Sequence, residues 1–358
     1  MYALIVIYVA ISIVTYVFSK AQNPLVSKQV KQFYLNSIFL LLSLIMGLRG
    51  VSVGTDTESY QQIFHRIASS PVSLDDIGFF NDSIEIGFLL YTKVLSLICN
   101  DYQFFLLISA FIFCFLMKRF IEYSTKDYFI ASVIFFSIGI YLAAFNIYRQ
   151  MLAVAFVTNG WIYFSERKYI KAVLLTVLAV TFHVSAIIYF LVYLAYYFKD
   201  NRIVMRVAPL MMVVVLVSFN FIIANIAPYI EHYRNYIGNQ KTIQDANFVM
   251  ILWLIECLVS LAFIYKPSMP PLRQFVGNMC LMYVLMNLIG LSFNYIERFG
   301  LYFAPFLILL FCNFSDVIKN RVAKDVLFLG MVTCFLVYFI MSTSSEQYLY
   351  VSPLLNIM

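Results

Sequence analysis

The chain has little charge. Only 12% of its 358 residues are Asp, Glu, Lys or Arg, whereas 63% are hydrophobic, and the mean hydropathy is +0.87. Soluble domains usually carry roughly 25% charged residues, so this composition excludes a water-soluble globule. Apolar runs recur along the whole chain and leave no stretch for a sizeable soluble domain. The composition therefore predicts a polytopic membrane protein with one integral membrane domain over residues 1–358.

Several motifs are also lacking. Residues 1–19 have neither a basic start nor a small-residue cleavage pattern, so we expect a retained first span. The six cysteines show no CxxC spacing, which argues against a zinc site or a disulfide framework. No GxxxxGK[ST] loop occurs, so ATP hydrolysis is not expected. The chain predicts no cofactor, no metal and no nucleic-acid partner.

Twelve apolar segments have lengths suited to crossing a bilayer as helices. They lie at about 2–19, 33–50, 102–121, 128–145, 147–164, 169–182, 184–198, 203–223, 248–265, 272–292, 295–314 and 324–341. Segment 86–98 is also apolar, but it is short and carries Lys93 at its middle, so we expect an interfacial helix. The fold class predicted is all-α with about twelve transmembrane helices.

The basic residues indicate the sidedness. With 86–98 excluded as a span, 17 of the 24 basic residues and 6 of the 18 acidic ones fall on one side. By the positive-inside rule that side is the cytoplasm, which puts both termini outside. Two longer segments, 51–101 and 225–247, then become outer loops, the first of them containing the interfacial helix.

Three arginines lie at span ends on the outer face: Arg49, Arg149 and Arg298. An arginine at membrane depth is costly and usually faces a cavity, a counter-ion or an anionic ligand. Its planar fork suits phosphate oxygens, and it keeps its charge. The alternatives are snorkelling to lipid headgroups or a local ion pair, as Glu297 beside Arg298 allows.

Other outer residues carry possible chemistry. His183 interrupts an apolar stretch, either as a capping histidine or as a pyrophosphate or sugar ligand or a proton acceptor. Loop 51–101 is acidic, and Asp56 and Glu58 stand near its start. In loop 225–247 three tyrosines have helical spacing, which suits sugar binding or an interfacial aromatic belt: Tyr229, Tyr233 and Tyr236.

Five stretches together resemble the EpsG-like family of bacterial polysaccharide polymerases, which is allied to the Wzy O-antigen polymerases. They are "GLRGVSVGTDTESYQQIF", "SIEIGFLL", "YRQMLAVAF", "FHVSAIIYF" and "ERFGLYF", and they extend over about 250 residues. Glu85-Ile-Gly stands where Glu-Pro-Gly is commoner in the family, so the local turn differs from the family pattern.

The resemblance implies a GT-C-like membrane glycosyltransferase at the periplasmic face of the bacterial inner membrane. Its donor would be an undecaprenyl-pyrophosphate-linked oligosaccharide and its acceptor a second lipid-linked repeat unit. Arg49, Arg149 and Arg298 would bind the pyrophosphate, with His183 orienting it. Asp56, preferred over Glu58, would accept the proton of the attacking hydroxyl or bind the acceptor sugar. The residues expected to contact glycan are Tyr60, Gln150, Tyr229, Tyr233, Tyr236 and Glu297.

Two rival functions stay open beside the O-antigen or exopolysaccharide polymerase. An O-antigen ligase uses the same donor and a different acceptor. A lipid-linked oligosaccharide flippase also suits twelve spans, but it should carry charges through the depth of the membrane and often two related halves. A chain-length regulator is a partner that the resemblance alone suggests.

Overall fold

The computed structural model describes residues 24–70, 84–226, 246–291 and 296–313, with short pieces between 320 and 352. Over these residues it is helical and holds no β-strand. The predicted first span and the three tyrosines of loop 225–247 lie outside the described residues. The predicted all-α class is confirmed over the described part of the chain.

Ten of the twelve predicted spans fall wholly or mostly within the described residues and each of them contains helix, whereas the twelfth, at about 324–341, lies mostly outside them. The helices are α2 (Pro24–Gly47), α6 (Tyr102–Ser124), α7 (Tyr128–Ser137), α8 (Ile140–Asn146), α9 (Tyr148–Ser165), α10 (Tyr169–Phe182), η1 (Val184–Ile188), α11 (Tyr189–Tyr197), α12 (Arg202–Ile226), α13 (Ala246–Tyr265), α14 (Pro271–Gly290), α15 (Glu297–Gly300) and α16 (Pro305–Cys312). Predicted loop 51–101 contains two more helices, α3 (Thr57–Ser69) and α5 (Ile86–Ile98).

Among the described residues three helical stretches are long and apolar enough to cross a membrane: Ser27–Gly47, Tyr102–Ser124 and Pro271–Gly290. Helices α7 and α8 meet the same test as one span bent by 43°. The chain is therefore a multi-pass membrane protein. Helix α5 has 13 residues and is too short to span by itself, as its sequence indicates.

The chain divides into two compact units, Met1–Ile187 with Phe335–Met358, and Ile188–Cys334. In the first unit α2 packs on α6, α6 on α9, and α9 on α10. Asp101 begins α6 by accepting hydrogen bonds from the amides of Gln103 at 2.5 Å and Phe104 at 3.4 Å, which satisfies two otherwise open donors of the first turn. Phe113 and Phe135 are among the aromatic side chains buried between these helices.

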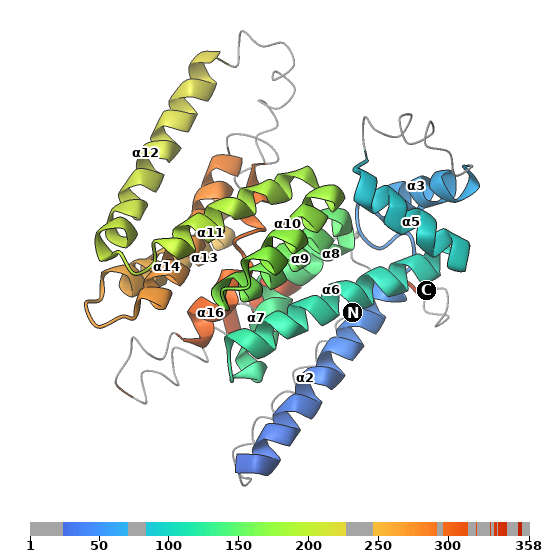
Figure 1. Ribbon diagram of the computed structural model, residues 1–358, viewed down its shortest axis with the longest axis horizontal. Helices are drawn as coiled ribbons and strands as arrows, with labels where there is room; N and C mark the ends of the chain where they lie inside the picture. Colours follow the sequence, from blue (N-terminus) through green and yellow to red (C-terminus); the bar gives the residue numbers. More distant parts are fainter. Residues whose placement is uncertain are drawn as a thin grey trace. The chain divides into compact units, whose positions relative to one another are not determined.

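Helices α3 and α5 lie side by side in the first unit (Figure 1). Phe64 and Ile67 of α3 are buried, while its charged residues Glu58 and Arg66 are exposed. Lys93 of α5 donates to three carbonyl oxygens at the end of α3, those of Ile67 at 3.1 Å, Ala68 at 3.0 Å and Ser70 at 2.7 Å. A cation at the C-terminus of a helix donates to the open carbonyl groups there and interacts favourably with the helix dipole. Lys93 therefore links α5 to the end of α3.

In the second unit α14 packs against α12, α13 and α16. The Asn278 side chain donates to the Met205 carbonyl of α12 at 3.0 Å, and the Phe275 ring lies 5.3 Å from Tyr196 and 5.4 Å from Phe306. Gly277 lets α13 approach closely, since a Cβ there would lie 2.8 Å from the Ser260 carbonyl oxygen. The Asn278 hydrogen bond thus joins α14 to α12, and the close approach at Gly277 packs α14 against α13.

Candidate active site

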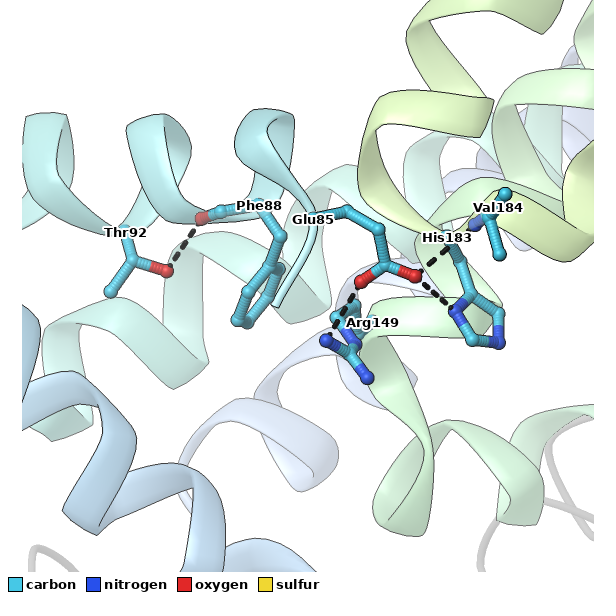
Figure 2. A network of polar contacts seen from close by, with 6 residues as sticks. All are labelled: Glu85, Phe88, Thr92, Arg149, His183 and Val184. Atoms are coloured by element: carbon cyan, nitrogen blue, oxygen red, sulfur yellow. Dashed lines mark hydrogen bonds and ion pairs between the residues drawn. The ribbon is translucent and has the colours of Figure 1, made fainter. Parts of the chain in front are cut away.

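One carboxylate joins two of the predicted site residues. Glu85 Oε2 lies 2.8 Å from Arg149 Nη1, and Glu85 Oε1 lies 2.9 Å from His183 Nδ1. The amide of Val184 also donates to Oε1, at 3.1 Å. Figure 2 shows the carboxylate between the guanidinium and the imidazole. Residues far apart in the sequence thus form one charged cluster, which we call the Glu85 cluster: Glu85, Arg149, His183 and Val184.

Three helix ends bring these side chains together. Glu85 directly precedes α5, Arg149 lies in the first turn of α9, and His183 directly follows α10. His183 ends α10 with an extended backbone, and its amide still donates to the Ala179 carbonyl at 2.9 Å. Each residue therefore stands at a helix end, where the helix has open backbone groups.

Gly87 sets the spacing between α5 and α10. A Cβ at this position would lie 2.1 Å from Thr181 Oγ1 and 2.8 Å from the Thr181 carbonyl oxygen, closer than any real contact. Only glycine permits this approach, which brings Glu85 within hydrogen-bond distance of His183. The Glu-Ile-Gly stretch therefore supplies both the carboxylate of Glu85 and the glycine that allows α5 to approach α10.

Aromatic rings pack beside the Glu85 cluster. The Phe88 ring of α5 lies 6.1 Å from Tyr60 of α3, 6.0 Å from Tyr148 of α9 and 6.3 Å from Phe182 of α10. The guanidinium carbon of Arg149 lies 5.9 Å from the same ring. Because one buried ring contacts three helices, Phe88 fixes the start of α5 relative to both partners of Glu85.

The cluster keeps Glu85 ionised. Partial burial by itself would raise the pKa of Glu85, but the hydrogen bond from His183, the charge of Arg149 and the amide of Val184 outweigh it, so the pKa lies below its ordinary value. The side chains of Glu85, Arg149 and His183 are 21%, 20% and 23% exposed. Solvent therefore reaches part of each of the three side chains.

Arg49 has a different environment. It is only 1% exposed, and it donates to the carbonyl oxygens of Met46 at 2.7 Å and Phe145 at 3.1 Å, with its guanidinium carbon 4.8 Å from the Phe145 ring centre. A small, mostly apolar cavity lies beside it, lined also by Ser109 and Tyr148. These contacts join the end of α2 to the end of α8. Pyrophosphate binding by Arg49 stays a prediction.

The Gly-Thr-Asp stretch packs its backbone against the end of α8. Gly54 has a φ of 96°, and a Cβ there would lie 2.8 Å from the Phe145 carbonyl oxygen. The Thr55 amide donates to Asn146 Oδ1 at 2.9 Å, and Thr57 Oγ1 donates to the Val53 carbonyl at 2.7 Å. The loop that carries Asp56 thus contacts Asn146, which precedes Arg149 by three residues in the chain.

The two predicted carboxylates of this loop remain available. Asp56 directly precedes α3 without capping it, and within the described residues its carboxylate has no hydrogen bond or ion pair. Glu58 is exposed in the first turn of α3. The Tyr60 ring lies 4.2 Å from the ring of Tyr148, next to Arg149, whereas Gln150 is buried within α9.

Arg298 and Glu297 belong to the second unit, in the short helix α15. Glu297 packs on Gly290, whose added Cβ would lie 2.8 Å from the Cβ of Glu297. Over the described residues, no three His, Cys, Asp or Glu side chains gather as metal ligands would. The structure therefore brings Arg149 and His183 together, sets Asp56 in the neighbouring loop, and encloses Arg49 and Gln150.

Glu85 is the site residue that the sequence did not single out. The Glu-Gly segment was noticed only as a landmark of the resemblance, and no role was attached to its carboxylate. A usable signal existed, since an outer cation in an apolar chain needs a counter-ion. The sequence separation of 64 residues from Arg149 and 98 from His183 concealed the pairing.

A multi-pass helical membrane protein with a solvent-accessible Arg-Glu-His cluster at its helix ends is the class that the fold and the site define. The model of the EpsG family matches residues 32–355, and the chain therefore belongs to the EpsG family. The match includes every described residue of the Glu85 cluster. No curated protein and no solved structure matches the chain.

Proposed function

We propose that the chain is an O-antigen or exopolysaccharide polymerase, a GT-C-like glycosyltransferase of about twelve spans in the bacterial inner membrane. It joins undecaprenyl-pyrophosphate-linked repeat units at the periplasmic face. Membership of the EpsG family supports a polysaccharide polymerase-like activity. The observation that carries the proposal is the Arg149–Glu85–His183 cluster, which combines a fixed cation and a proton-accepting group on one accessible surface.

The reaction requires charge stabilisation more than it requires a cofactor. A hydroxyl oxygen of the acceptor sugar bonds to the anomeric carbon of the donor, while the bond from that carbon to the pyrophosphate oxygen breaks. The pyrophosphate leaves with the electron pair, and a base takes the hydroxyl proton. A preorganised guanidinium beside the leaving oxygen stabilises the charge that develops on it. Arg149 takes this role, because its guanidinium is accessible and already held in place.

The remaining predicted residues keep the ligand roles that the sequence predicts for them. Arg298 is proposed as a further pyrophosphate contact, and the same role for Arg49 stays the alternative to a purely structural one. Tyr60 and Asp56 or Glu58, around the start of α3, are proposed to meet the acceptor glycan, and Gln150, Glu297 and the tyrosines of loop 225–247 to contact glycan elsewhere. The chain-length regulator remains the proposed protein partner.

The experiment is chain extension by the purified protein in lipid nanodiscs. Lipid-linked repeat units are supplied without a lipid A core, and products are separated on a gel. A ladder of lengths is the result expected of a polymerase. Full chains made only after core acceptor is added identify a ligase, and movement of unextended donor across a vesicle bilayer identifies a flippase.

The matched variants are Arg149→Ala and Arg66→Ala. Both remove an arginine of the first unit, but Arg66 is exposed on α3 and is not a member of the Glu85 cluster. Arg149→Ala should abolish the ladder, and Arg66→Ala should retain it. Full chain extension by Arg149→Ala would remove the leaving-group role proposed for this arginine.

A further inference from the structure

The Glu85 cluster constrains the protonation of His183. An ionised carboxylate only accepts hydrogen bonds, so the imidazole nitrogen 2.9 Å from Glu85 Oε1 must carry a hydrogen. That nitrogen is Nδ1. In the neutral ring the other nitrogen, Nε2, then has no hydrogen and presents a lone pair. Arg149 on the opposite oxygen keeps Glu85 in the charged, accepting state.

The orientation of the imidazole is fixed from two directions. The Val184 amide donates to the same Oε1, so the carboxylate cannot turn away from His183 without losing a backbone bond. The His183 backbone is held as well, since its amide donates to Ala179 and its carbonyl accepts from the Ala186 amide at 3.0 Å. The ring therefore meets the carboxylate at Nδ1 in a defined geometry.

Nε2 is the nitrogen left for chemistry. Within the described part of the chain it makes no hydrogen bond, and Figure 2 shows it on the side of the ring away from Glu85. The His183 side chain is also part-exposed, so a hydroxyl can approach it. An acceptor nitrogen that is oriented by a carboxylate on its other side is the arrangement of a general base.

We propose that Glu85 is a positioning residue that holds His183 in the Nδ1–H form, and that His183 Nε2 takes the proton of the acceptor hydroxyl. This inference rests on the proposed function and deepens it. It assigns the proton to His183, and it leaves Asp56 the binding of the acceptor sugar. Glu85 touches no substrate and acts through its two partners.

The proton and the charges balance in this scheme. As the acceptor oxygen bonds to the anomeric carbon, its proton passes to the lone pair of Nε2, and the pyrophosphate departs with the electrons of the broken bond. The imidazolium that forms has its Nδ1–H against the Glu85 carboxylate, which stabilises the new positive charge. The proton returns from Nε2 to water before the next turn. Arg149 remains beside the leaving group throughout.

The direct test is the tautomer of His183, measured without any substrate. The chain has only three histidines, so His65→Asn with His232→Asn leaves His183 as the single one. Nitrogen-15 NMR of this histidine-labelled variant in bilayers, at a pH where the ring is neutral, distinguishes the two tautomers. We expect the Nδ1–H form, and we expect Glu85→Ala to shift the majority to Nε2–H. A wild-type ring in the Nε2–H form, or a spectrum unchanged by Glu85→Ala, overturns the inference.

The activity test compares three variants whose folding is checked by gel filtration. Loss of a general base costs about 100-fold or more, so His183→Ala should lose at least this factor in kcat. Asp56→Asn should change kcat by less than about threefold and act mainly on the KM for the acceptor. His65→Asn is the matched control and should extend chains normally. If Asp56→Asn loses as much kcat as His183→Ala, the proton does not go to His183.

The two tests separate the inference from the proposed function. If the unmutated protein makes no ladder, the polymerase proposal fails, whereas the tautomer result still decides how Glu85 positions His183. If the ladder forms but Glu85→Ala leaves the tautomer unchanged, the polymerase stands and the positioning role falls.

Discussion

Two arginines that look alike in the sequence differ in the structure. Arg49 follows α2 and is sealed, with carbonyl oxygens of Met46 and Phe145 as its partners. Arg149 begins α9 and is part-exposed, with the carboxylate of Glu85 as its partner. Backbone carbonyls enclose the Arg49 guanidinium, whereas the Arg149 guanidinium stays part-exposed while it pairs with Glu85. The nature of the partner therefore separates a cation that holds the fold from one that is available to a ligand.

The largest effect is expected at Arg149. Arg149→Ala should slow chain extension by about 100-fold to 1,000-fold, because removing one preorganised donor from a developing anion has that magnitude. Its unfolding temperature should change little, since a part-exposed ion pair contributes only about 1 kcal/mol. Initial rates in nanodiscs and thermal unfolding in detergent measure the two quantities. If Arg149→Ala instead loses much stability while its rate per folded molecule is unchanged, Arg149 is a structural cation like Arg49.

Arg49→Met should give the opposite result. The substitution leaves two buried carbonyl oxygens without their donor, which costs about 2 to 4 kcal/mol. We expect a lower unfolding temperature and less folded protein, with the rate per folded molecule close to that of the unmutated chain. Gel-filtration recovery after heating provides the measurement. If folded Arg49→Met protein is as slow as Arg149→Ala, Arg49 binds the pyrophosphate as the sequence predicted.

Gly87→Ala tests the seat of the Glu85 cluster. Alanine normally stabilises a helix relative to glycine by roughly 1 kcal/mol, but here the added Cβ would meet Thr181 at 2.1 Å. We expect a loss of about 1 to 3 kcal/mol from overpacking, together with slower chain extension as Glu85 moves from His183. Gly330→Ala is the matched control, since an added Cβ there meets nothing within 4 Å. If Gly87→Ala and Gly330→Ala have the same stability and the same rate of chain extension, α5 does not approach α10 closely at Gly87.

Acid should weaken the cluster at Glu85. The groups facing this carboxylate are Arg149 and His183, and its pKa lies below the ordinary value of 4.5. A lowered carboxyl pKa gives stability that is present above the ordinary value and is lost as the pH falls through the lowered one. The unfolding temperatures of the unmutated chain and Glu85→Gln should therefore differ at pH 7 and still at pH 4.5, and should converge below it. A difference that disappears between pH 7 and 5 contradicts the lowered pKa.

Lys93 gives the smallest expected effect and extends the comparison to a third cation. Like Arg49 it is held by carbonyl oxygens, but at the end of α3 and only part-buried. Lys93→Met should lower stability by about 1 kcal/mol or less and leave the rate of chain extension unchanged. A rate loss comparable to that of Arg149→Ala would show that carbonyl partners do not identify a structural cation.

The sequence predicts most of the described helices, but it does not predict which residues pair with the arginines at the helix ends. Apolar length predicted helix where the structure has it in ten segments and identified α5 as a short helix, because an apolar run is a property of local composition, whereas the number of spans stays a prediction. It missed α3 as an element, since half of that helix is polar. It ranked Arg49 and Arg149 equally because burial and counter-ions are tertiary properties. Their partners, Phe145 and Glu85, lie 96 and 64 residues away along the chain.

The order of the Glu85 cluster along the chain has a consequence for biogenesis. Glu85 is synthesised first, Arg149 later, and His183 with Val184 last, 98 residues after the carboxylate. Until these residues have been synthesised, the Glu85 carboxylate has neither of its two side-chain partners in the folded protein. A carboxylate at the start of a short apolar helix is costly to draw into lipid, so we expect α5 to stay near the membrane surface until α9 and α10 are inserted. The charge that pairs with Arg149 and His183 in the folded protein is thus expected to influence the insertion of the helix that it precedes.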